Sequence, residues 1–529
     1  MSCIENNIFQ KDKIEQSYLG DYIGNSYTIS NIELAYKILY QKEKKFNANN
    51  LYVRFLPKDA NEYVKLEEQY GFSLFNYPLD FKYIEKDIPY HDPSLNNDQI
   101  TWQYIVVPIK DKLPRGIKTE ILSSIYLPSA KEIELEEQAR KQVIPNYTPN
   151  TERSQKRGSV YVIDNSYPEG DGRRLQVLPF LYVRIGHDLR YEIIESNEQG
   201  FYQTSMRFDN SADTDIKFSN VKASMRTSWF SWSNAYHRRI YANNTPALGI
   251  NIFPPEYNFL WQMSIAWVAI NNFWKYCEQD GISLPPNNTN IWIKTSDSPM
   301  GSGSAHMINK SHLGLHLSEW AAGMGAPLAV MADAIAPDVI LEIVPTEKNS
   351  IYISSLMFHE LTHASHYSYV GNDYWYRLAD GEIMNQIQYG DSYYNCNGYE
   401  KELIKLEESY ANYREDFLLN RKYGIGMPLD IEIGCKYSNN LIPHLFNDLT
   451  DYATETDTIP NNLGCTISDY SNNPIISERD LFLSLTPTTY SFTELKPKLD
   501  NAIFGNLTGF WRQIYYGTYI DKLFQSYGY

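Results

Sequence analysis

The spacing of hydrophobic and polar residues changes along the chain and divides it into three parts. The first part, to about residue 150, combines helical spacing over Ile32–Lys45 with extended apolar segments at Leu51–Phe55 and Trp102–Val107. The charged helical segment Ser129–Gln142 and the polar tract Pro145–Arg157 mark its end. We therefore predict an N-terminal α+β region over residues 1–150.

The second part, residues 151–245, contains short segments in which apolar and polar residues alternate. Gly, Asp and Asn turns separate them, which is typical of a small antiparallel β-sandwich. The segments are Ser159–Ile163, Gln176–Ile185, Tyr191–Ile194, Phe201–Arg207 and Asp215–Phe218. From 246 to 529 the spacing is helical, from Tyr257–Trp261 to the terminal run Phe510–Phe524. The predicted fold class is multidomain α+β with a mainly helical C-terminal domain.

One strand and one helix stand out in this last part. Asp338–Val344 is an apolar, β-rich run followed by turn-like residues, and we predict that it forms an edge strand. A helix is expected next to it, with Ser354 or Ser355 as its N-cap and Gly371-Asn372 at its end.

The predicted helix contains the sequence His359-Glu360-Leu361-Thr362-His363. Residues four apart lie on one face of a helix, so both imidazoles can reach one tetrahedral zinc ion. Glu360, placed between them, can accept a proton from zinc-bound water as this water attacks a carbonyl group. The pattern therefore predicts two zinc ligands and a general base.

A catalytic zinc site usually has three protein ligands and one open position, so another ligand is expected downstream. His366 lies about two turns from His359, too far along one helix to bind the same ion, and we interpret it as a residue behind the ligands or on the surface. The next helical segment, Glu400–Leu419, has adjacent acids at Glu407 and Glu408. Periodicity does not choose between them, and a solvated acidic turn is the alternative.

The segment HELTHASHY, which begins at His359, and the later Glu408-Ser-Tyr-Ala-Asn resemble motifs of zinc-metallopeptidase-like lipoproteins from Gram-negative gut-type bacteria. Those proteins resemble gluzincins, in which a glutamate is the third ligand. The resemblance implies that His359, His363 and Glu408 bind one Zn²⁺ per chain and that Glu360 is the general base. It favours Glu408 over Glu407, because Ser-Tyr-Ala follows Glu408 directly.

The resemblance extends over most of the chain. Asn412 departs from the pattern, because gluzincins often carry an acidic residue one turn after the third ligand. Asn197–Tyr202 is similar to a turn of carboxypeptidase-regulatory-like β-sandwiches. In the N-terminal region the similar segments are Leu51–Asp59, Tyr77–Asp80, His91–Leu95 and Trp102–Pro108. The resemblance implies an exported protein of the cell surface or periplasm, anchored by lipid.

Composition and cysteine usage limit the partners of the chain. A formal net charge of −17 argues against binding to nucleic acid or to an anionic membrane surface. The 5 cysteines include no close pair, so neither a Cys-based zinc site nor a disulfide scaffold is indicated. Cys3 precedes a polar tract suited to a tether, and Met1-Ser2 leave no room for an apolar signal. We expect a trimmed form of an exported lipoprotein, with its outer-membrane lipid anchor at or near Cys3.

Two functions follow as hypotheses. The first is a monomeric zinc peptidase that binds a peptide or protein substrate in extended form along Asp338–Val344. Its oxyanion donor is left open between Tyr413 and His444. The alternative is a non-catalytic, zinc-bearing surface lipoprotein that binds glycans or host proteins. A purely structural zinc would require a fourth ligand, for which His366 would have to be considered.

Overall fold

The protein is described by a computed structural model. It covers residues 16–84, 90–96, 99–148, 152–209, 212–226, 236–237, 250–252, 258–295, 302–311, 337–344, 347, 349–390, 392, 398–425, 441–450, 476–506, 520–521, 523–525 and 527–529. Cys3 and most of the run Phe510–Phe524 lie outside the described residues. The fold is multidomain α+β, as predicted, with a helical C-terminal part.

The N-terminal part is built on a three-stranded antiparallel sheet with the order β4-β2-β5. Val53 of the central strand lies opposite Ile105 and Ile121, and Val53 and Ile105 are buried in the local core. Short helices and a two-stranded β1-β3 sheet complete this part. Its elements are β1 (Tyr18–Tyr22), α1 (Ile29–Tyr40), β2 (Asn50–Leu56), α2 (Ala60–Val64), the π-helix η1 (Lys65–Gln69), β3 (Phe81–Ile84), β4 (Gln103–Pro108), β5 (Lys118–Ile125) and α3 (Ile133–Val143).

Two sheets with a common core follow, as the alternating pattern predicted. One contains β10-β6-β14 with β7 paired to β6, and the other has the order β13-β11-β8-β9. Val160 and Val162 of the first sheet and Val183 and Ile185 of the second are buried in one cluster, because alternate side chains of each strand face inward. The elements are β6 (Ser154–Ile163), the 3₁₀ turn η2 (Gly172–Arg174), β7 (Leu175–Val177), β8 (Tyr182–His187), β9 (Arg190–Glu195), β10 (Phe201–Phe208), β11 (Asp213–Lys217), β13 (Tyr236–His237) and β14 (Ile250–Ile252).

Strand pairing crosses the boundary expected at residue 245. β12 (Ala223–Arg226) pairs in parallel with β15 (Thr289–Thr295), and β14 pairs in parallel with β6. The middle part is therefore not purely antiparallel, and each side of residue 245 supplies a strand to a sheet of the other side.

The C-terminal part combines a small sheet with long helices. The sheet has the order β12-β15-β17-β16, where β16 is Ser302–Ser304 and β17 is Val339–Ile343. The prediction that Asp338–Val344 forms an edge strand is wrong, because β17 has β15 on one side and β16 on the other. The helices are α4 (Asn258–Asp280), α5 (Ile308–Ser311), α7 (Ser350–Val370), α8 (Asn372–Tyr389), α9 (Lys401–Tyr423), α10 (Pro443–Thr450), α11 (Glu478–Ser484) and α12 (Phe492–Asn506).

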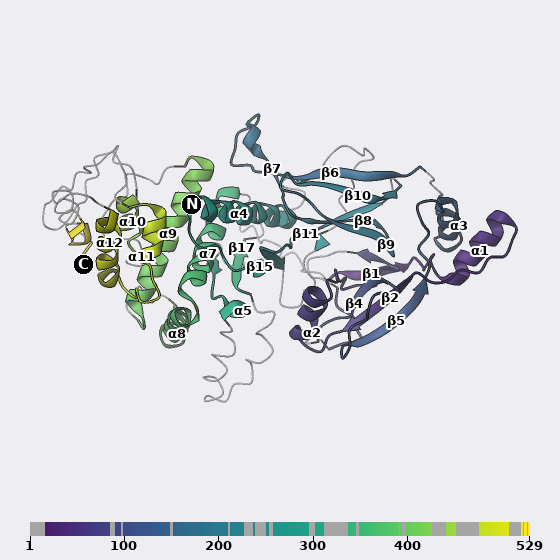
Figure 1. The fold of residues 1–529 in the computed structure, drawn as a ribbon, viewed down its shortest axis with the longest axis horizontal. Helices are drawn as coiled ribbons and strands as arrows, with labels where there is room; N and C mark the ends of the chain where they lie inside the picture. Colours follow the sequence, from purple (N-terminus) through teal and green to yellow (C-terminus); the bar gives the residue numbers. More distant parts are fainter. Residues whose placement is uncertain are drawn as a thin grey trace, which may run out of the picture.

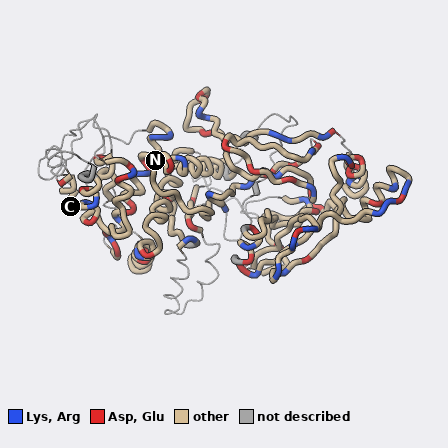
Figure 2. Tube along the Cα trace, viewed as in Figure 1, with Lys and Arg blue, Asp and Glu red and all other residues tan. Residues whose placement is uncertain are grey.

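The molecule is elongated, with the helices α7 to α12 at one end and the N-terminal strands with α1 at the other (Figure 1). α4 runs from the helical end toward the strands β6 to β11 (Figure 1). Acidic and basic residues are interspersed along the described trace (Figure 2). Among the described helices, none combines the length and the hydropathy that crossing a bilayer requires.

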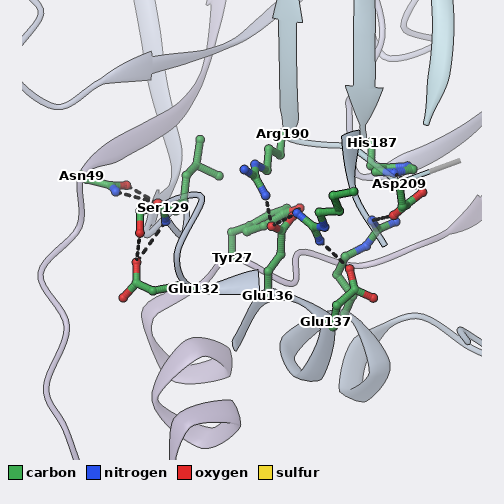
Figure 3. A network of polar contacts seen from close by, with 12 residues as sticks. Tyr27, Asn49, Ser129, Glu132, Glu136, Glu137, His187, Arg190 and Asp209 are labelled. Carbon is green, nitrogen blue, oxygen red and sulfur yellow. Dashed lines mark hydrogen bonds and ion pairs between the residues drawn. The ribbon is translucent and has the colours of Figure 1, made fainter. Parts of the chain in front are cut away.

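A buried ionic network joins the N-terminal part to the strands that follow it (Figure 3). Glu136 of α3 accepts a hydrogen bond of 2.8 Å from the hydroxyl of Tyr27 and forms ion pairs with Arg153 at 2.7 Å and with Arg190 of β9. Arg153 also pairs with Glu137. Each of these charged side chains is at most 4% exposed, so the network fixes α3 against β9 inside the protein.

Candidate metal centre

Helix α7 carries the HExxH sequence in its middle. Asn349 caps its N-terminus by accepting hydrogen bonds from the backbone N–H groups of Ile351 and Tyr352, and Gly371 ends it with a positive φ of 79°. The predicted end is confirmed, whereas the predicted start at Ser354 or Ser355 is wrong. Both serines lie inside the helix, where their hydroxyls contact residues of α9.

Helix α9 packs along α7 and brings Glu408 to both histidines of the motif. One carboxylate oxygen of Glu408 lies 3.3 Å from Nε2 of His359, and the other lies 3.4 Å from Nε2 of His363. The three ligand atoms lie within 4.8 Å of one another. The group His359, His363 and Glu408 can therefore hold a metal ion, and the acid that completes it is Glu408 rather than Glu407.

The electrostatics of this group favour a cation. Burial disfavours the charged imidazoles, but hydrogen bonds and the charge of Glu408 raise the pKa of His359 and of His363 above the ordinary value. Burial likewise opposes ionisation of Glu408, but the two histidines hold its pKa well below the usual range. Protons on the imidazoles compensate the carboxylate in the metal-free protein, and a bound metal ion would replace them.

Glu415 orients the first ligand. The ring Nδ1 of His359 donates to the carboxylate of Glu415 at 3.2 Å, and Ser355 donates a further hydrogen bond to that carboxylate. The side-chain amide of Asn412 instead donates to the backbone carbonyl of Glu408 at 2.7 Å. The acidic residue expected near position 412 is thus found one turn later. Glu415 lies seven residues after Glu408 and therefore on the same face of α9. This spacing is visible in the sequence.

Glu407 and His366 form a layer behind the metal group. The carboxylate of Glu407 accepts hydrogen bonds from Nδ1 of His366 at 2.9 Å and from the hydroxyl of Tyr374, and it lies 4.0 Å from Nδ1 of His363. The other ring nitrogen of His366 contacts the carbonyl of Leu485 at 2.7 Å. His366 is fully buried with both ring nitrogens engaged, so it is neither a surface residue nor a fourth ligand in this arrangement.

Glu360 lies beside the metal group and against the short strand β16. It is 4% exposed, and burial raises its pKa to about 7, with a smaller contribution from the charge of Glu408. Gly303 of β16 packs against it so closely that a Cβ on this glycine would lie 2.7 Å from the Cδ atom of Glu360. A carboxyl group with a pKa near neutrality can both accept and return a proton.

A cavity of about 20 Å³ adjoins Glu360, His363 and Glu408. This volume suits about one water molecule. Residues at and after β16 form one wall. The other wall is one face of α8, because its lining residues Leu378, Ala379 and Glu382 lie three, four and seven residues after Trp375. The remaining lining residues are Ser304, Ala305, His306, Trp375, Leu378, Ala379 and Glu382. None of these was predicted, because nothing in the sequence relates this face of α8 to the residues after β16.

The two residues considered as oxyanion donors lie elsewhere. The hydroxyl of Tyr413 contacts Thr450 at 2.7 Å and donates to Glu478. His444 belongs to α10, and burial lowers the pKa of its ring. Neither residue lines the cavity beside Glu360.

Comparison of the chain with protein-family models, with curated proteins and with solved structures finds no match. The resemblance to zinc-metallopeptidase-like lipoproteins therefore stays a prediction.

Proposed function

We propose that the chain is a zinc-dependent peptidase. The observation that carries the proposal is the position of Glu360, a buried carboxyl group that lines a cavity together with His363 and Glu408 of the His–His–Glu group. A buried carboxylate destabilises the fold. A catalytic role explains why one lies beside the metal group, whereas a purely structural metal site does not require it.

The donor set fits zinc. Two imidazole nitrogens and one carboxylate oxygen are the three protein ligands of many catalytic zinc sites, which keep a fourth position open. Glu415 supports the ligand His359 through a hydrogen bond to the nitrogen that faces away from the group. Zinc bound by these residues would supply a Lewis acid that activates water and polarises a carbonyl group.

Glu360 is the proton carrier of the proposed reaction. It takes a proton from water while the water oxygen bonds to the peptide carbonyl carbon, and it returns this proton to the nitrogen as the C–N bond breaks. Water enters from the adjoining cavity, which Glu360 itself lines.

The substrate proposed is a peptide in extended form that adds to β16. Among the described strands, β16 pairs with β17 alone, so its other edge offers backbone groups for pairing. This edge replaces β17 as the expected substrate strand. Because Gly303 of β16 packs against Glu360, a peptide on this edge would run past the proton carrier.

Metal analysis and peptide hydrolysis test the proposal together. We expect about one zinc per chain in the wild-type protein and a large loss of zinc in His359→Ala. Glu360→Gln should keep the zinc and lose cleavage of a mixed peptide library, because it removes the base but no ligand. Cleavage by Glu360→Gln at the wild-type rate would refute the catalytic assignment. Bound zinc without any cleavage by the wild type would instead favour the alternative, a surface protein that binds glycans or host proteins.

A further inference from the structure

Hydrolysis of a peptide places negative charge on the carbonyl oxygen, and a donor aimed at that charge is usually worth a large part of the rate. Besides His363, which belongs to the metal group, the residues that line the cavity include three side chains with an N–H or O–H group, namely Ser304, His306 and Trp375. The indole N–H of Trp375 is already used, since it donates to the backbone carbonyl of His306 at 3.1 Å. His306 is the one ring among them that can carry a positive charge.

The position of His306 is fixed from one face of α8. Trp375 holds its backbone, and Glu382, two turns later on α8, lies 3.0 Å from its Nε2 atom. Glu382 is 8% exposed, so its carboxylate gains from this partner. The other ring nitrogen, Nδ1, forms no hydrogen bond with any residue that the structure describes. An imidazole bound through one nitrogen to a carboxylate keeps the other for a second partner.

The surroundings of His306 favour its charged form. In the metal-free protein, burial lowers the pKa of the ring, but the hydrogen bond and charge of Glu382 raise it, and the charges of Glu360 and Glu408 raise it further. The balance is a pKa above the ordinary value of 6.5. A cationic ring on the wall of this cavity is a stronger donor to an anion than a neutral one.

We propose that His306, oriented by Glu382, donates a hydrogen bond to the oxyanion of the tetrahedral intermediate. The inference rests on the proposed peptidase function and adds a catalytic residue to it. His306 keeps its proton throughout. The carbonyl π electrons move to the oxygen as the water oxygen bonds to carbon, the N–H of His306 stabilises that oxygen, and the proton taken by Glu360 goes to the leaving nitrogen.

The first experiment compares His306→Leu and His306→Gln with the wild type in steady-state peptide hydrolysis. His306→Leu should lower kcat about 100-fold to 1,000-fold with KM changed less than threefold, because the interaction forms in the transition state. His306→Gln should recover part of the rate, since its amide retains a donor. Zinc content and circular dichroism should equal those of the wild type. A loss confined to KM would overturn the inference and assign His306 to binding of a substrate carboxylate.

The second experiment does not depend on turnover. A phosphinic tripeptide, whose tetrahedral phosphinate mimics the intermediate, is titrated calorimetrically into the zinc-loaded proteins, together with a cleaved peptide as the ground-state control. We expect His306→Leu to weaken phosphinate binding at least tenfold and to leave binding of the product peptide unchanged. Equal phosphinate affinity in the wild type and His306→Leu, or no binding by either, overturns the inference.

Glu382→Gln tests the orienting role. It should lower kcat less than His306→Leu does, and it should shift the pH profile, because the ring loses the carboxylate that favours its charged form. If the wild type cleaves peptides while His306→Leu and Glu382→Gln match it, the peptidase proposal stands and the role of His306 fails. If no protein cleaves any peptide, the peptidase proposal fails and the inference fails with it.

Discussion

Glu360 affects stability as well as chemistry. Burial raises its pKa to about 7 in the metal-free protein, whereas an ordinary Glu titrates at 4.5. Between these pH values the unfolded chain releases a proton that the folded chain keeps, so stability falls as pH rises through this window and stays lower above it. Glu360, which the proposed reaction needs, therefore lowers the free energy of unfolding of the metal-free protein at neutral and higher pH.

Glu360→Gln should stabilise the metal-free protein at pH 8. The substitution removes a buried carboxylate without changing its shape, and the gain in the free energy of unfolding should reach up to about 3 kcal/mol. At pH 4.5 the folded wild type has a neutral carboxyl group, so the gain should be small. Urea unfolding in the presence of a chelator measures both values. A gain of equal size at the two pH values would contradict the explanation.

Gly303→Ala should impair catalysis without removing the metal. The added methyl group would lie 2.7 Å from the Cδ atom of Glu360, so either this carboxyl group or β16 must move. A displacement near 1 Å can lower kcat about 100-fold, while the ligands His359, His363 and Glu408 are untouched. Gly172→Ala is the matched control, since a Cβ at Gly172 meets no atom within 4 Å. If Gly303→Ala keeps the wild-type kcat, the methyl group displaces β16 and not the carboxyl group of Glu360.

The sequence contained the ligands but not the cavity. His359 and His363 follow from helical spacing, because both lie on one helix whose pitch is known. Glu408 needed the resemblance, since periodicity could not separate it from Glu407. His306 lies in the connection after β16 and Glu382 lies on α8, and only the folded arrangement brings them beside Glu360. No local pattern records a contact of this kind.

At the scale of elements, the pairing of α7 with α9 assembles the ligands and their support. α9 contributes Glu408 to the metal group and, two turns later, Glu415 to the far side of His359. The two helices must therefore keep their register along at least two turns for the site to form.

Glu415→Gln should weaken zinc binding by about 10-fold to 100-fold, because the ring of His359 loses the carboxylate that orients it and raises its basicity. Competition with a zinc-binding dye at constant pH measures the affinity. Glu402→Gln, on the first turn of the same helix, should leave the affinity unchanged. Equal effects of the two substitutions would indicate a general weakening of α9 rather than a loss of orientation at His359.

The sheet beside α7 was harder to predict than the helices. β17 has the apolar run that indicates a buried strand, and such a run does not reveal whether one or two neighbours pair with it. β16 is the three-residue sequence Ser-Gly-Ser, which carries no apolar alternation and reads as a turn. The small residues of β16 let it pack closely against Glu360. The same residues give no strand signal in the sequence, so this strand was not predicted.

At the scale of the whole molecule, the buried network around Glu136 links the end remote from the metal group to the central strands (Figure 3). Glu136→Ala should lower the free energy of unfolding by about 3–5 kcal/mol, because it leaves Arg153 and Arg190 charged, buried and without this partner. Chemical denaturation followed by tyrosine and tryptophan fluorescence measures the loss.

The matched control for this network is Glu43→Ala. Glu43 pairs with Lys37 at 2.8 Å, but both side chains are more than half exposed, so water and salt screen the pair. No measurable change is expected. A small effect of Glu136→Ala, comparable to that of Glu43→Ala, would mean that water enters the network and solvates its arginines.

The exchange of β12 and β14 across residue 245 limits how the protein can be divided. A fragment that ends there leaves β12 without β15, and the complementary fragment leaves β14 without β6. Each piece would expose unpaired backbone groups beside an apolar surface, a combination that promotes aggregation. Anyone who wishes to excise the metal-bearing helices for expression would have to carry the preceding strands along, and gene fusions joined at that point would inherit the same defect.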